Sequence, residues 1–385
     1  MRPFSNALCA PGLGVIAEFK RRSPSAGDLR PRGDPMELTV AFARAGASAV
    51  SVLVDERFGG SLTDLEAART VAPDTPLLAK GFFREERQLL QLKLAGADAA
   101  LLLLRDLDDD RMRALMAYAT ELRLETLVEA HDAAELERAV ALNAPVIGVN
   151  ARNLSTFRID RRAQLDLVAR APRDRVVIAE SGIASRAQAA AAELAGADGV
   201  LVGSTLMRAK EPAVKLRELL SRPLVKVCGL TREEDVAVAA EAGADLAGFI
   251  LAKESPRRAK RVLEVPDTML AVAVFVEDVA KTDADLDQVY ARENGHRSRD
   301  AALFRGEERV ATVVDLPWQQ GDPSHVERAH AAEGRVMLAG GLSAENVREA
   351  IEAVRPWAVD ASSRLEVEPG VKDHDAVRAF VEAAR

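Results

Sequence analysis

Residues 15–25 read VIAEFKRRSPS and join a buried strand to a charged strand end. The apolar and small residues at the start of this stretch predict the strand. Glu18 and Lys20 lie two positions apart, so their side chains leave the same face of that strand. Residues 23–27 then read SPSAG and predict a loop. The stretch therefore predicts a carboxylate and an ammonium group that point together beyond the strand end, with a solvated run of charges as the alternative.

A corner between helix and strand recurs along the chain and indicates the fold class. At four places a helical pattern ends in a glycine between alanines, and an apolar run follows. Glycine there fits the left-handed residue that ends a helix. Strands that alternate with helices in this way predict βαβ units and a parallel sheet. The four glycines are Gly46, Gly96, Gly196 and Gly243.

Residues 1–220 contain eight apolar runs, and a helical segment follows each of them. This pattern predicts a (β/α)8 barrel of the TIM type, in which functional residues lie at the C-terminal ends of the strands. A doubly wound open sheet is the alternative, but no Gly-x-Gly-x-x-Gly turn follows the first strand. The expected strands are 14–19, 49–54, 76–80, 98–104, 125–129, 146–150, 176–180 and 199–203.

A second domain is expected over residues 222–385, after the junction Arg222-Pro223. Residues 224–231 read LVKVCGLT and predict a new strand and turn, and a helix with an acidic first turn follows. We count about seven strands in this half. The predicted fold is therefore α/β, with two TIM-type (β/α)8 barrels in tandem. The second is shortened, and its closure is left open.

Composition limits the classes of partner. The formal net charge of −8 argues against a nucleic-acid partner, because phosphate backbones require a basic face. No run reaches the roughly 18 apolar residues that a membrane helix needs. The two cysteines, Cys9 and Cys228, suggest neither a disulfide framework nor a zinc site. We expect a cytoplasmic monomer without a metal, a nucleic-acid partner or a membrane partner.

Charged and amide side chains stand at the ends of five predicted strands. An inward charge there is costly unless it faces a ligand. An ion-pair network would explain any two of these residues, but it explains five poorly. Ser181-Gly182 and Gly203-Ser204 follow the seventh and eighth strands, where this fold tends to hold a phosphate on backbone N–H groups. The five residues are Lys20, Lys80, Glu129, Asn150 and Glu180.

Five motifs in the first half resemble indole-3-glycerol-phosphate synthase. The resemblance covers most of residues 1–220. It implies an enzyme that closes the indole ring of a carboxyphenylamino deoxyribulose phosphate, with loss of CO2 and water and without a cofactor. The motifs are 16–20 (IAEFK) with 23–25 (SPS), 127–131 (LVEAH), 147–154 (IGVNARNL), 179–183 (AESGI) and 201–204 (LVGS).

The resemblance also implies roles for single residues. Lys80 would be the general acid that protonates the carbonyl, Lys20 would bind the anthranilate carboxylate, and Glu129 would act in the dehydration. Glu180 and Asn150 would hold sugar hydroxyls, with Glu18 beside the two lysines in the catalytic set. Lysines next to carboxylates have proton affinities that differ, as acid and base duties require. The phosphate would be held by Ser23, Ser181, Gly182, Gly203 and Ser204.

Motifs in the second half resemble phosphoribosylanthranilate isomerase, which carries out an Amadori rearrangement that yields the synthase substrate. They are 226–231 (KVCGLT), 248–250 (GFI) with 255–257 (SPR), 338–343 (LAGGLS) with 345–347 (ENV), 359–363 (VDASS) and 369–373 (PGVKD). The resemblance implies that Cys228 is the general base, Asp315 the general acid and Arg257 the ligand of the anthranilate carboxylate. The substrate and its phosphate would be held by Gly340, Gly341, Asp360, Ser362 and Ser363.

Cys228 has two interpretations from the sequence alone. A lone cysteine is often an inert thiol of the core. A thiol at a helix N-terminus can instead have a lowered pKa and act as a base. The sequence leaves both open.

The sequence departs from the two families at a few positions. Lys80-Gly81-Phe82 stands where the synthase family has Lys-Asp-Phe. Residues 302–306 (ALFRG) stand where the isomerase family has Gln-Leu-His-Gly, and 309–315 follow without room for a helix, a strand and a helix. Residues 316–321 replace a glycine-rich segment, and Arg364 replaces a glycine.

The function expected from these resemblances is a bifunctional enzyme of tryptophan biosynthesis that acts on small phosphorylated anilino sugars. The first alternative is an active synthase with a degenerate isomerase domain. The second is a phosphosugar-binding protein without turnover.

Overall fold

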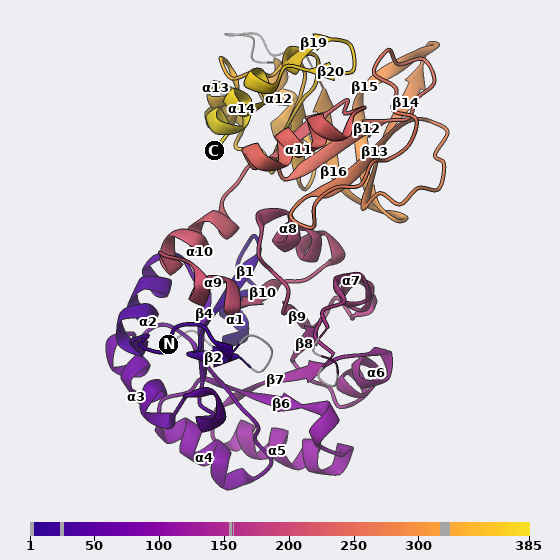
Figure 1. The fold of residues 1–385 in the computed structure, drawn as a ribbon. Helices are drawn as coiled ribbons and strands as arrows, with labels where there is room; N and C mark the ends of the chain where they lie inside the picture. Colours follow the sequence, from indigo (N-terminus) through magenta and orange to yellow (C-terminus); the bar gives the residue numbers. More distant parts are fainter. Residues whose placement is uncertain (1–3, 24–26, 154–155, 157, 316–323) are drawn as a thin grey trace. The chain divides into compact units, whose positions relative to one another are not determined.

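The computed structural model describes residues 4–23, 27–153, 156, 158–315 and 324–385. The chain divides into two compact units (Figure 1). One consists of Met1–Ala184 and Ala189–Leu220, and the other of Ser185–Gln188 and Ser221–Arg385. Each unit contains one closed barrel.

Eight strands close the first barrel in the order β1-β10-β9-β8-β7-β6-β5-β4. Every neighbouring pair is parallel, so the C-terminal ends of all eight strands meet at one end of the barrel. The predicted (β/α)8 barrel is confirmed, and each predicted strand overlaps an observed one. The strands are β1 (Gly14–Phe19), β4 (Ala49–Leu53), β5 (Leu77–Lys80), β6 (Ala99–Leu103), β7 (Glu125–Ala130), β8 (Val146–Asn150), β9 (Val176–Glu180) and β10 (Gly199–Val202).

Helices surround this barrel (Figure 1). Aspartate side chains cap several of them, among them Asp132, which accepts a hydrogen bond from the backbone N–H of Glu135. The glycines predicted at the helix ends have positive φ, for example 96° at Gly96. The helices are α1 (Phe4–Leu8), α2 (Pro35–Arg44), α3 (Leu62–Val71), α4 (Glu86–Leu94), α5 (Asp109–Glu121), α6 (Ala133–Ala141), α7 (Arg161–Arg170), α8 (Arg186–Ala195), α9 (Ser204–Arg208) and α10 (Pro212–Leu220). A small hairpin, β2 (Arg22–Ser23) with β3 (Gly27–Asp28), follows β1.

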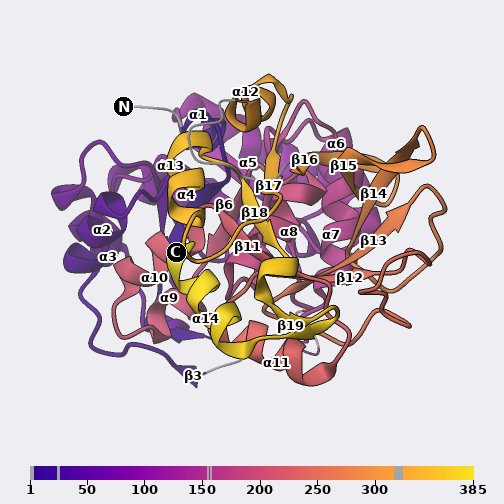
Figure 2. The same cartoon turned by 90° about the horizontal axis from the view of Figure 1, so that it is seen from above.

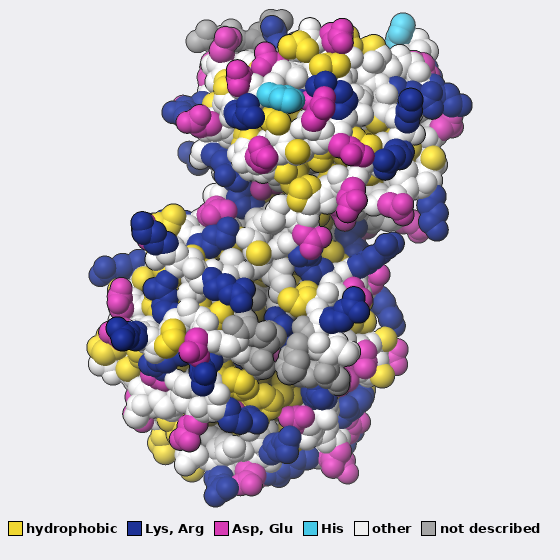
Figure 3. Space-filling view, viewed as in Figure 1, with side chains coloured by type: hydrophobic (Ala, Val, Ile, Leu, Met, Phe, Trp, Pro, Cys, Tyr) yellow, Lys and Arg dark blue, Asp and Glu magenta, His cyan; other side chains and the backbone are white. Residues whose placement is uncertain are grey.

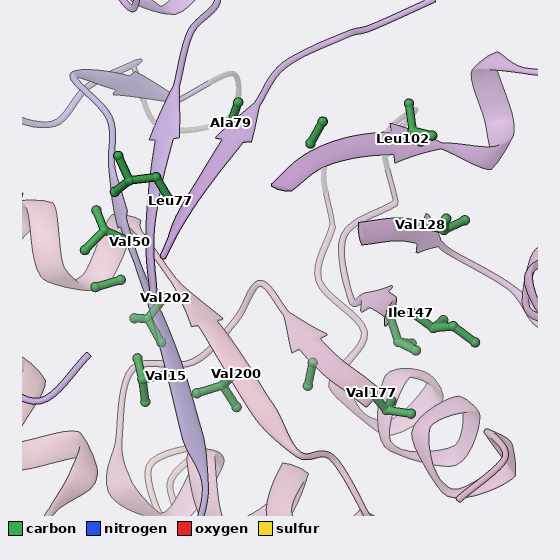
Figure 4. Packing of buried hydrophobic residues seen from close by; sticks show 14 of the residues in the cluster. Val15, Val50, Leu77, Ala79, Leu102, Val128, Ile147, Val177, Val200 and Val202 are labelled. Carbon is green, nitrogen blue, oxygen red and sulfur yellow. The ribbon is translucent and has the colours of Figure 1, made fainter. Parts of the chain in front are cut away.

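The core of the first unit has two layers. Between strands and helices, strand residues such as Val15, Val50 and Val177 (Figure 4) belong to one cluster with the helix residues Phe42 and Leu89. A second cluster, formed by alternate strand residues, fills the barrel interior. It includes Ile16, Leu78, Leu127, Ile178 and Leu201.

The second barrel is closed by eight strands in the order β11 to β18. The count of about seven strands was therefore wrong. Seven strands run parallel, and β15 pairs antiparallel with both of its neighbours. The strands are β11 (Leu224–Cys228), β12 (Leu246–Ile250), β13 (Leu270–Val276), β14 (Leu286–Glu293), β15 (His296–Arg305), β16 (Glu308–Asp315), β17 (Val336–Ala339) and β18 (Ala358–Ala361).

Two tight turns explain the reversed strand. Asn294 and Gly295, between β14 and β15, both have positive φ (52° and 81°), as a type I′ hairpin turn requires. Gly306, with φ 59°, lies in the turn between β15 and β16. These turns leave no room for a helix between β14 and β16. Residues 251–307 are all described, and the loops between β12 and β14 contain no helix either. The second half is thus shortened, as predicted, because the connections between β12 and β16 lack helices.

Helices cover the remaining part of the second barrel. In Figures 1 and 2 they lie away from β14 and β15. They are α11 (Glu233–Ala242), α12 (Ser324–Ala331), α13 (Val347–Val354) and α14 (His374–Ala383), and a short hairpin of β19 (Glu366–Glu368) and β20 (Val371–Lys372) precedes α14.

The surface of both units is mixed in charge. Lysine and arginine side chains are interspersed with aspartate and glutamate on the faces seen in Figure 3. Among the described residues, no helix has both the length and the apolar content that crossing a membrane would require.

Candidate active sites

A lysine and three glutamates meet at the C-terminal end of the first barrel. The Nζ atom of Lys80 lies 2.5 Å from Glu180 Oε2, 3.6 Å from Glu129 Oε2 and 3.8 Å from Glu18 Oε2. Lys20 forms an ion pair with Glu18. These residues come from four different strands, or from the residue directly after one, so the structure brings together the side chains that the sequence placed at strand ends.

The alternation of side chains along each strand produces this cluster. Glu18, Lys80, Glu129 and Glu180 each lie two positions beyond an apolar residue of the barrel interior. Residues two apart in a strand share a face, so the four charged groups also face the interior. Each of them is the last or the next-to-last residue of its strand. They therefore lie beyond the apolar layer, at the end of the barrel where a ligand could reach them.

Two glycines make room for the carboxylates. A Cβ atom at Gly148, in β8, would collide with Glu180 Oε1 and would lie 2.7 Å from Leu127 Cδ2. A Cβ atom at Gly203, directly after β10, would collide with Glu18 Oε1. The site therefore depends on the absence of a side chain at both positions.

Burial and charge set the proton affinities of this cluster apart. Burial and the nearby Glu129 raise the pKa of Glu180 to about 8. Burial alone would raise the pKa of Glu129 as well, but Lys80 and His131 hold it at about 2. Burial would lower the pKa of Lys80, but Glu180, Glu129 and Glu18 outweigh it and raise that pKa. The cluster thus offers a charged lysine, an ionised carboxylate and a carboxyl group that titrates near neutral pH.

His131 belongs to this site, although it was not among the predicted site residues. Its Nε2 atom lies 3.1 Å from Glu129 Oε1, and its Nδ1 atom lies 3.0 Å from Glu135 Oε2. Asn150 Nδ2 donates to the same Glu129 oxygen at 3.1 Å. Burial would lower the pKa of His131, but the two glutamates raise it to about 9. His131 is therefore protonated at neutral pH and helps to orient Glu129. The spacing of His131 and Glu135, four positions apart at the start of α6, was the available signal.

The predicted phosphate residues lie on two neighbouring loops. Ser181 and Gly182 have consecutive positive φ values, 70° and 77°, after β9. Gly203 and Ser204 follow β10 and begin α9. Thr205 Oγ1 donates to the carbonyl oxygen of Ile183 at 2.6 Å, which ties the two loops together. Ser23 is buried in β2, whereas Pro24, Ser25 and Leu154 of the quoted motifs lie outside the described residues.

The ring of Phe83 explains why position 81 is a glycine. A Cβ atom at Gly81 would lie 2.7 Å from Phe83 Cζ, and Phe83 is itself buried. The aromatic ring occupies the space that an aspartate at this position would need.

We predict that Gly148→Ala displaces Glu180 and slows the reaction of the first barrel more than it unfolds the protein. Overpacking of this kind typically lowers the free energy of unfolding by about 1–3 kcal/mol, whereas misplacement of a catalytic group by about 1 Å costs up to about 10²-fold in rate. Thermal unfolding and steady-state kinetics of ring closure check both parts.

Gly199→Ala is the matched control for that variant. Gly199 also lies in a strand of the first barrel, and a Cβ atom there would lie 2.9 Å from the carbonyl oxygen of Gly14. It stands at the start of β10, away from the carboxylates. An equal loss of kcat in the two variants would show that Gly148 has no specific role at the site.

A cavity of about 550 Å³ opens into the second barrel. All of the residues predicted for this half line it, and the structure therefore brings them together. They are Cys228, Arg257, Asp315, Gly340, Gly341, Asp360, Ser362 and Ser363. Arg364 is exposed and is not among the lining residues.

A chain of hydrogen bonds that was not predicted crosses this barrel. The fully buried Lys226 donates to Asp360 Oδ2 at 2.8 Å and to Gln288 Oε1 at 2.7 Å. Gln288 Nε2 donates to Tyr290 Oη at 2.8 Å, and the Tyr290 hydroxyl donates to Asp315 Oδ2 at 3.0 Å. Gln288 and Tyr290 are consecutive inward residues of β14, a strand that was not among the quoted motifs.

Of the two interpretations of Cys228, the one with a lowered pKa is wrong. Burial raises the pKa of the Cys228 thiol, and the nearby Lys226 only partly offsets this effect. α11 begins at Glu233, so Cys228 does not lie at a helix N-terminus. A Cβ atom at Gly248 would lie 2.7 Å from Cys228 Sγ, so this glycine makes room for the thiol.

The structure also shows where one of the two segments that depart from the isomerase family lies. Residues 302–306 form the end of the reversed β15 and its turn, at the end of the barrel opposite the C-terminal ends of the parallel strands. They are therefore no counterpart of a motif at the C-terminal end of a parallel strand. Residues 316–321 lie outside the described residues.

Two family models match the chain. The model described as indole-3-glycerol phosphate synthase matches residues 1–219. The model described as N-(5′-phosphoribosyl)anthranilate isomerase matches residues 318–383.

Curated relatives include single-function and multifunctional proteins. An indole-3-glycerol phosphate synthase of Nocardioides is 48% identical over 211 residues, which cover 54% of this chain and 81% of that protein. A multifunctional tryptophan biosynthesis protein of Phycomyces blakesleeanus is 32% identical, with 100% of this chain and 64% of that protein covered. For a protein of the same description from Schizosaccharomyces pombe the values are 30%, 96% and 59%. The chain thus spans about three fifths of the length of these two multifunctional relatives.

Among solved structures, phosphoribosyl anthranilate isomerase from Thermotoga maritima is 25% identical, and the match covers 42% of this chain and 98% of that chain with a TM-score of 0.35.

Proposed function

Because the chain belongs to the indole-3-glycerol phosphate synthase family, we propose that its first barrel closes the indole ring of 1-(2-carboxyphenylamino)-1-deoxyribulose 5-phosphate. We further propose that the second barrel makes this compound from N-(5-phosphoribosyl)anthranilate by an Amadori rearrangement. The observation that carries the proposal is the contact of Lys80 with three buried glutamates at the end of a parallel barrel.

Ring closure requires an acid at the carbonyl of the sugar chain. The ring carbon that bears the carboxylate attacks the carbonyl carbon, and the carbonyl oxygen becomes a hydroxyl group. Lys80 is charged and lies at the centre of the cluster, so it can supply that proton. Lys20, next to Glu18, would bind the substrate carboxylate until it leaves as CO2.

The dehydration that follows needs an acid and a base together. Near neutral pH, Glu180 holds a proton in a large fraction of molecules and can give it to the hydroxyl that leaves as water. Glu129 stays ionised and accepts the proton lost by the methylene carbon beside the anilino nitrogen, so that the C=C bond of the indole ring forms as water leaves. His131 and Asn150 hold Glu129 in place for this step.

The proposed isomerisation uses groups that line the cavity of the second barrel. Asp315 would give a proton to the ring oxygen of the ribose, which opens the ring. Ring opening leaves a protonated imine between C1′ of the sugar and the nitrogen. Cys228 would then remove the proton from C2′, and the enolamine becomes the ketone as its hydroxyl loses a proton and C1′ gains one. Lys226 offsets part of the cost of forming the thiolate. Neither reaction consumes an external oxidant or reductant, and we place both in the cytoplasm, where free thiols such as Cys228 stay reduced.

Two assays separate this proposal from its alternatives. In the first, the full chain receives the carboxyphenylamino sugar phosphate, and the absorbance of the indole product is followed. In the second, it receives phosphoribosylanthranilate together with a separate active synthase, so that only isomerisation limits the rate. Turnover in both supports the bifunctional enzyme. Turnover in the first alone supports a synthase with a non-catalytic second barrel, and turnover in neither supports a binding protein.

A further inference from the structure

We propose that His131 and Glu135, at the start of α6, determine which of two neighbouring glutamates is the acid and which is the base of the dehydration in the first barrel. The two residues act through Glu129 and do not touch the substrate, so they are positioning residues. The inference rests on the proposed ring closure and deepens it, because the contacts of Lys80 alone favour the opposite roles for Glu129 and Glu180.

Glu129 and Glu180 form a pair of buried carboxyl groups that share one proton. Gly148, in β8, lies directly opposite Glu129 in β7, and Glu180 Oε1 occupies the space beside this glycine where a side chain would begin. The two carboxyl groups are thereby close enough to form a hydrogen bond with each other. Glu129 Oε2 and Glu180 Oε1 make no other hydrogen bond to the described residues. Two carboxylates in such contact repel each other, so one of them holds a proton.

Lys80 by itself would place this proton on Glu129. Its Nζ atom lies 2.5 Å from Glu180 Oε2 but 3.6 Å from Glu129 Oε2. Because the attraction between charges falls with distance, the ammonium group stabilises a charge on Glu180 more than a charge on Glu129. The roles proposed for the dehydration are the reverse, with the proton on Glu180 and the charge on Glu129. A group other than Lys80 must therefore set the polarity of the pair.

His131 supplies the preference for a charge on Glu129. Its Nε2 atom lies 3.1 Å from Glu129 Oε1, and Asn150 Nδ2 donates to the same oxygen at 3.1 Å. A cation and an amide donor at one carboxylate oxygen both stabilise the ionised form. These contacts are to Oε1, whereas Lys80 approaches Oε2, so the three groups act on Glu129 together. Glu180 has no second cation, since its one ion pair within the described part of the chain is with Lys80.

Glu135 holds His131 in place and keeps it charged. Glu135 Oε2 accepts a hydrogen bond from the backbone N–H of His131 at 2.8 Å and lies 3.0 Å from the ring Nδ1 atom. The imidazole thus has a carboxylate at each ring nitrogen, and together these raise the pKa of His131 to about 9. With a proton on both nitrogens, the ring can donate to both carboxylates. The N-cap at Asp132 fixes the first turn of α6 and with it the position of Glu135.

The other charged groups of the cluster act on Glu18. Lys20 forms an ion pair with Glu18, and Arg152 also acts on this carboxylate. Within the described residues, the ion pairs of Glu129 and Glu180 are with Lys80 and His131 alone. The location of the shared proton therefore depends on the balance between this lysine and this histidine.

We expect His131→Leu to exchange the roles of the two glutamates. Glu129 then keeps only Asn150 at Oε1, whereas Glu180 keeps Lys80 at 2.5 Å. The shared proton moves to Glu129, so the leaving hydroxyl faces an ionised carboxylate and the methylene proton faces a protonated carboxyl group. Ring closure and loss of CO2 do not use this proton and should continue. His131→Gln, which keeps a neutral donor but no charge, should behave alike and serves as the second variant if the leucine variant does not fold.

A single-turnover experiment separates the two stages of the reaction. The full chain, in excess, is mixed with the carboxyphenylamino sugar phosphate that carries a radiolabel in its carboxylate, and CO2 release and indole absorbance are followed together. The His131 variants should release CO2 within about 3-fold of the wild-type rate but form indole about 10²-fold more slowly, the lower end of what acid–base groups supply. Equal slowing of both signals, as a structural role would give, or no slowing of either, would overturn the proposal.

Glu135→Gln tests the second residue of the pair through the pH dependence of indole formation. In wild-type protein the rate should fall as the pH rises through about 8, because Glu180 then loses the proton that it gives to the hydroxyl. Glutamine at position 135 can still accept from His131, but the charge that holds the proton on the ring is gone. Since loss of one opposite charge lowers a pKa by about 1 or more, the fall should begin about one pH unit lower in this variant. An unchanged profile would remove Glu135 from the proposal.

Glu137→Gln is the matched control. Glu137 also belongs to α6, but its side chain is 76% exposed and lies 3.7 Å from Arg170. Its replacement removes the same charge from the same helix and should leave the pH profile unchanged. A shift equal to that in Glu135→Gln would show a general charge effect of the helix and would also overturn the proposal.

The position of the proton can also be observed without turnover. Neutron diffraction from crystals of the full chain, grown in D2O at pH 7, locates deuterium on carboxyl oxygens. We expect deuterium on Glu180 in wild-type protein and on Glu129 in His131→Leu. Deuterium on Glu129 in wild-type protein, or on the same glutamate in both proteins, would contradict the inference. Absence of indole from wild-type protein would instead defeat the proposed ring closure and would leave the diffraction result as the test of the pair.

Discussion

Replacement of Lys80 by alanine should lower kcat for indole-ring closure by at least about 10³-fold, within the range that a general acid supplies. The reason is geometric, because the Lys80 ammonium group contacts Glu18, Glu129 and Glu180 at once and is held at the centre of the cluster. Lys20, the other lysine of the cluster, pairs with Glu18 at its edge. We expect Lys20→Ala to raise KM more than it lowers kcat. Steady-state kinetics with the carboxyphenylamino sugar phosphate distinguish the two effects.

Removal of Lys80 also leaves buried carboxylates without their cation, and this effect needs its own control. Loss of one partner of a buried ion pair typically lowers the free energy of unfolding by about 3–5 kcal/mol. Glu180 can relieve part of this loss by taking up a proton, since its pKa is already about 8. The double replacement of Lys80 by methionine and Glu180 by glutamine removes the pair together and should fold well. Retention of more than a tenth of wild-type turnover in a folded Lys80 variant would remove Lys80 from the acid role.

The first site could be predicted from the sequence because spacing within single strands determines which side chains face it. Glu18, Lys80, Glu129 and Glu180 follow apolar residues by two positions, and parallel strands bring their C-terminal ends together. His131 was missed because its spacing from Glu135 indicates only the contact between these two residues, whereas its role depends on the distance between its ring and Glu129. The room for Glu180 beside Gly148 likewise depends on the neighbouring strand.

The second site was harder to predict because its barrel departs from the regular pattern. Counting strands by alternation with helices gave about seven, since that method does not recognise a strand joined by two tight turns. Asn294-Gly295, a pair typical of a two-residue hairpin, was the signal that predicts β15. With β15 reversed, Arg297 reaches the cavity and Tyr290 faces Asp315. Neither contact follows from the motifs that resemble the isomerase family.

Replacement of Cys228 by alanine should abolish isomerisation, by at least about 10³-fold in kcat, and leave ring closure unchanged. Cys228 lines the cavity of the second barrel, whereas the lysine cluster belongs to the first. The two assays on one preparation therefore act as controls for each other. An equal loss in both would point to a folding defect and away from a role for the thiol in catalysis.

The pH dependence gives this prediction a second, independent check. Only the thiolate form of Cys228 can take the proton from the sugar, and burial raises the pKa of this thiol above its ordinary value of 9.0. In wild-type protein kcat/KM for isomerisation should therefore rise with pH, by about tenfold per unit below that pKa if no other group titrates. The same shift affects stability, because the folded state keeps a proton that the unfolded state loses. Wild-type stability should be complete below about pH 9 and decline as the pH rises through the folded pKa, and Cys228→Ala should lack this decline. A rate that is flat between pH 6 and 9, together with unfolding curves of the same pH dependence in both proteins, would exclude Cys228 as the base.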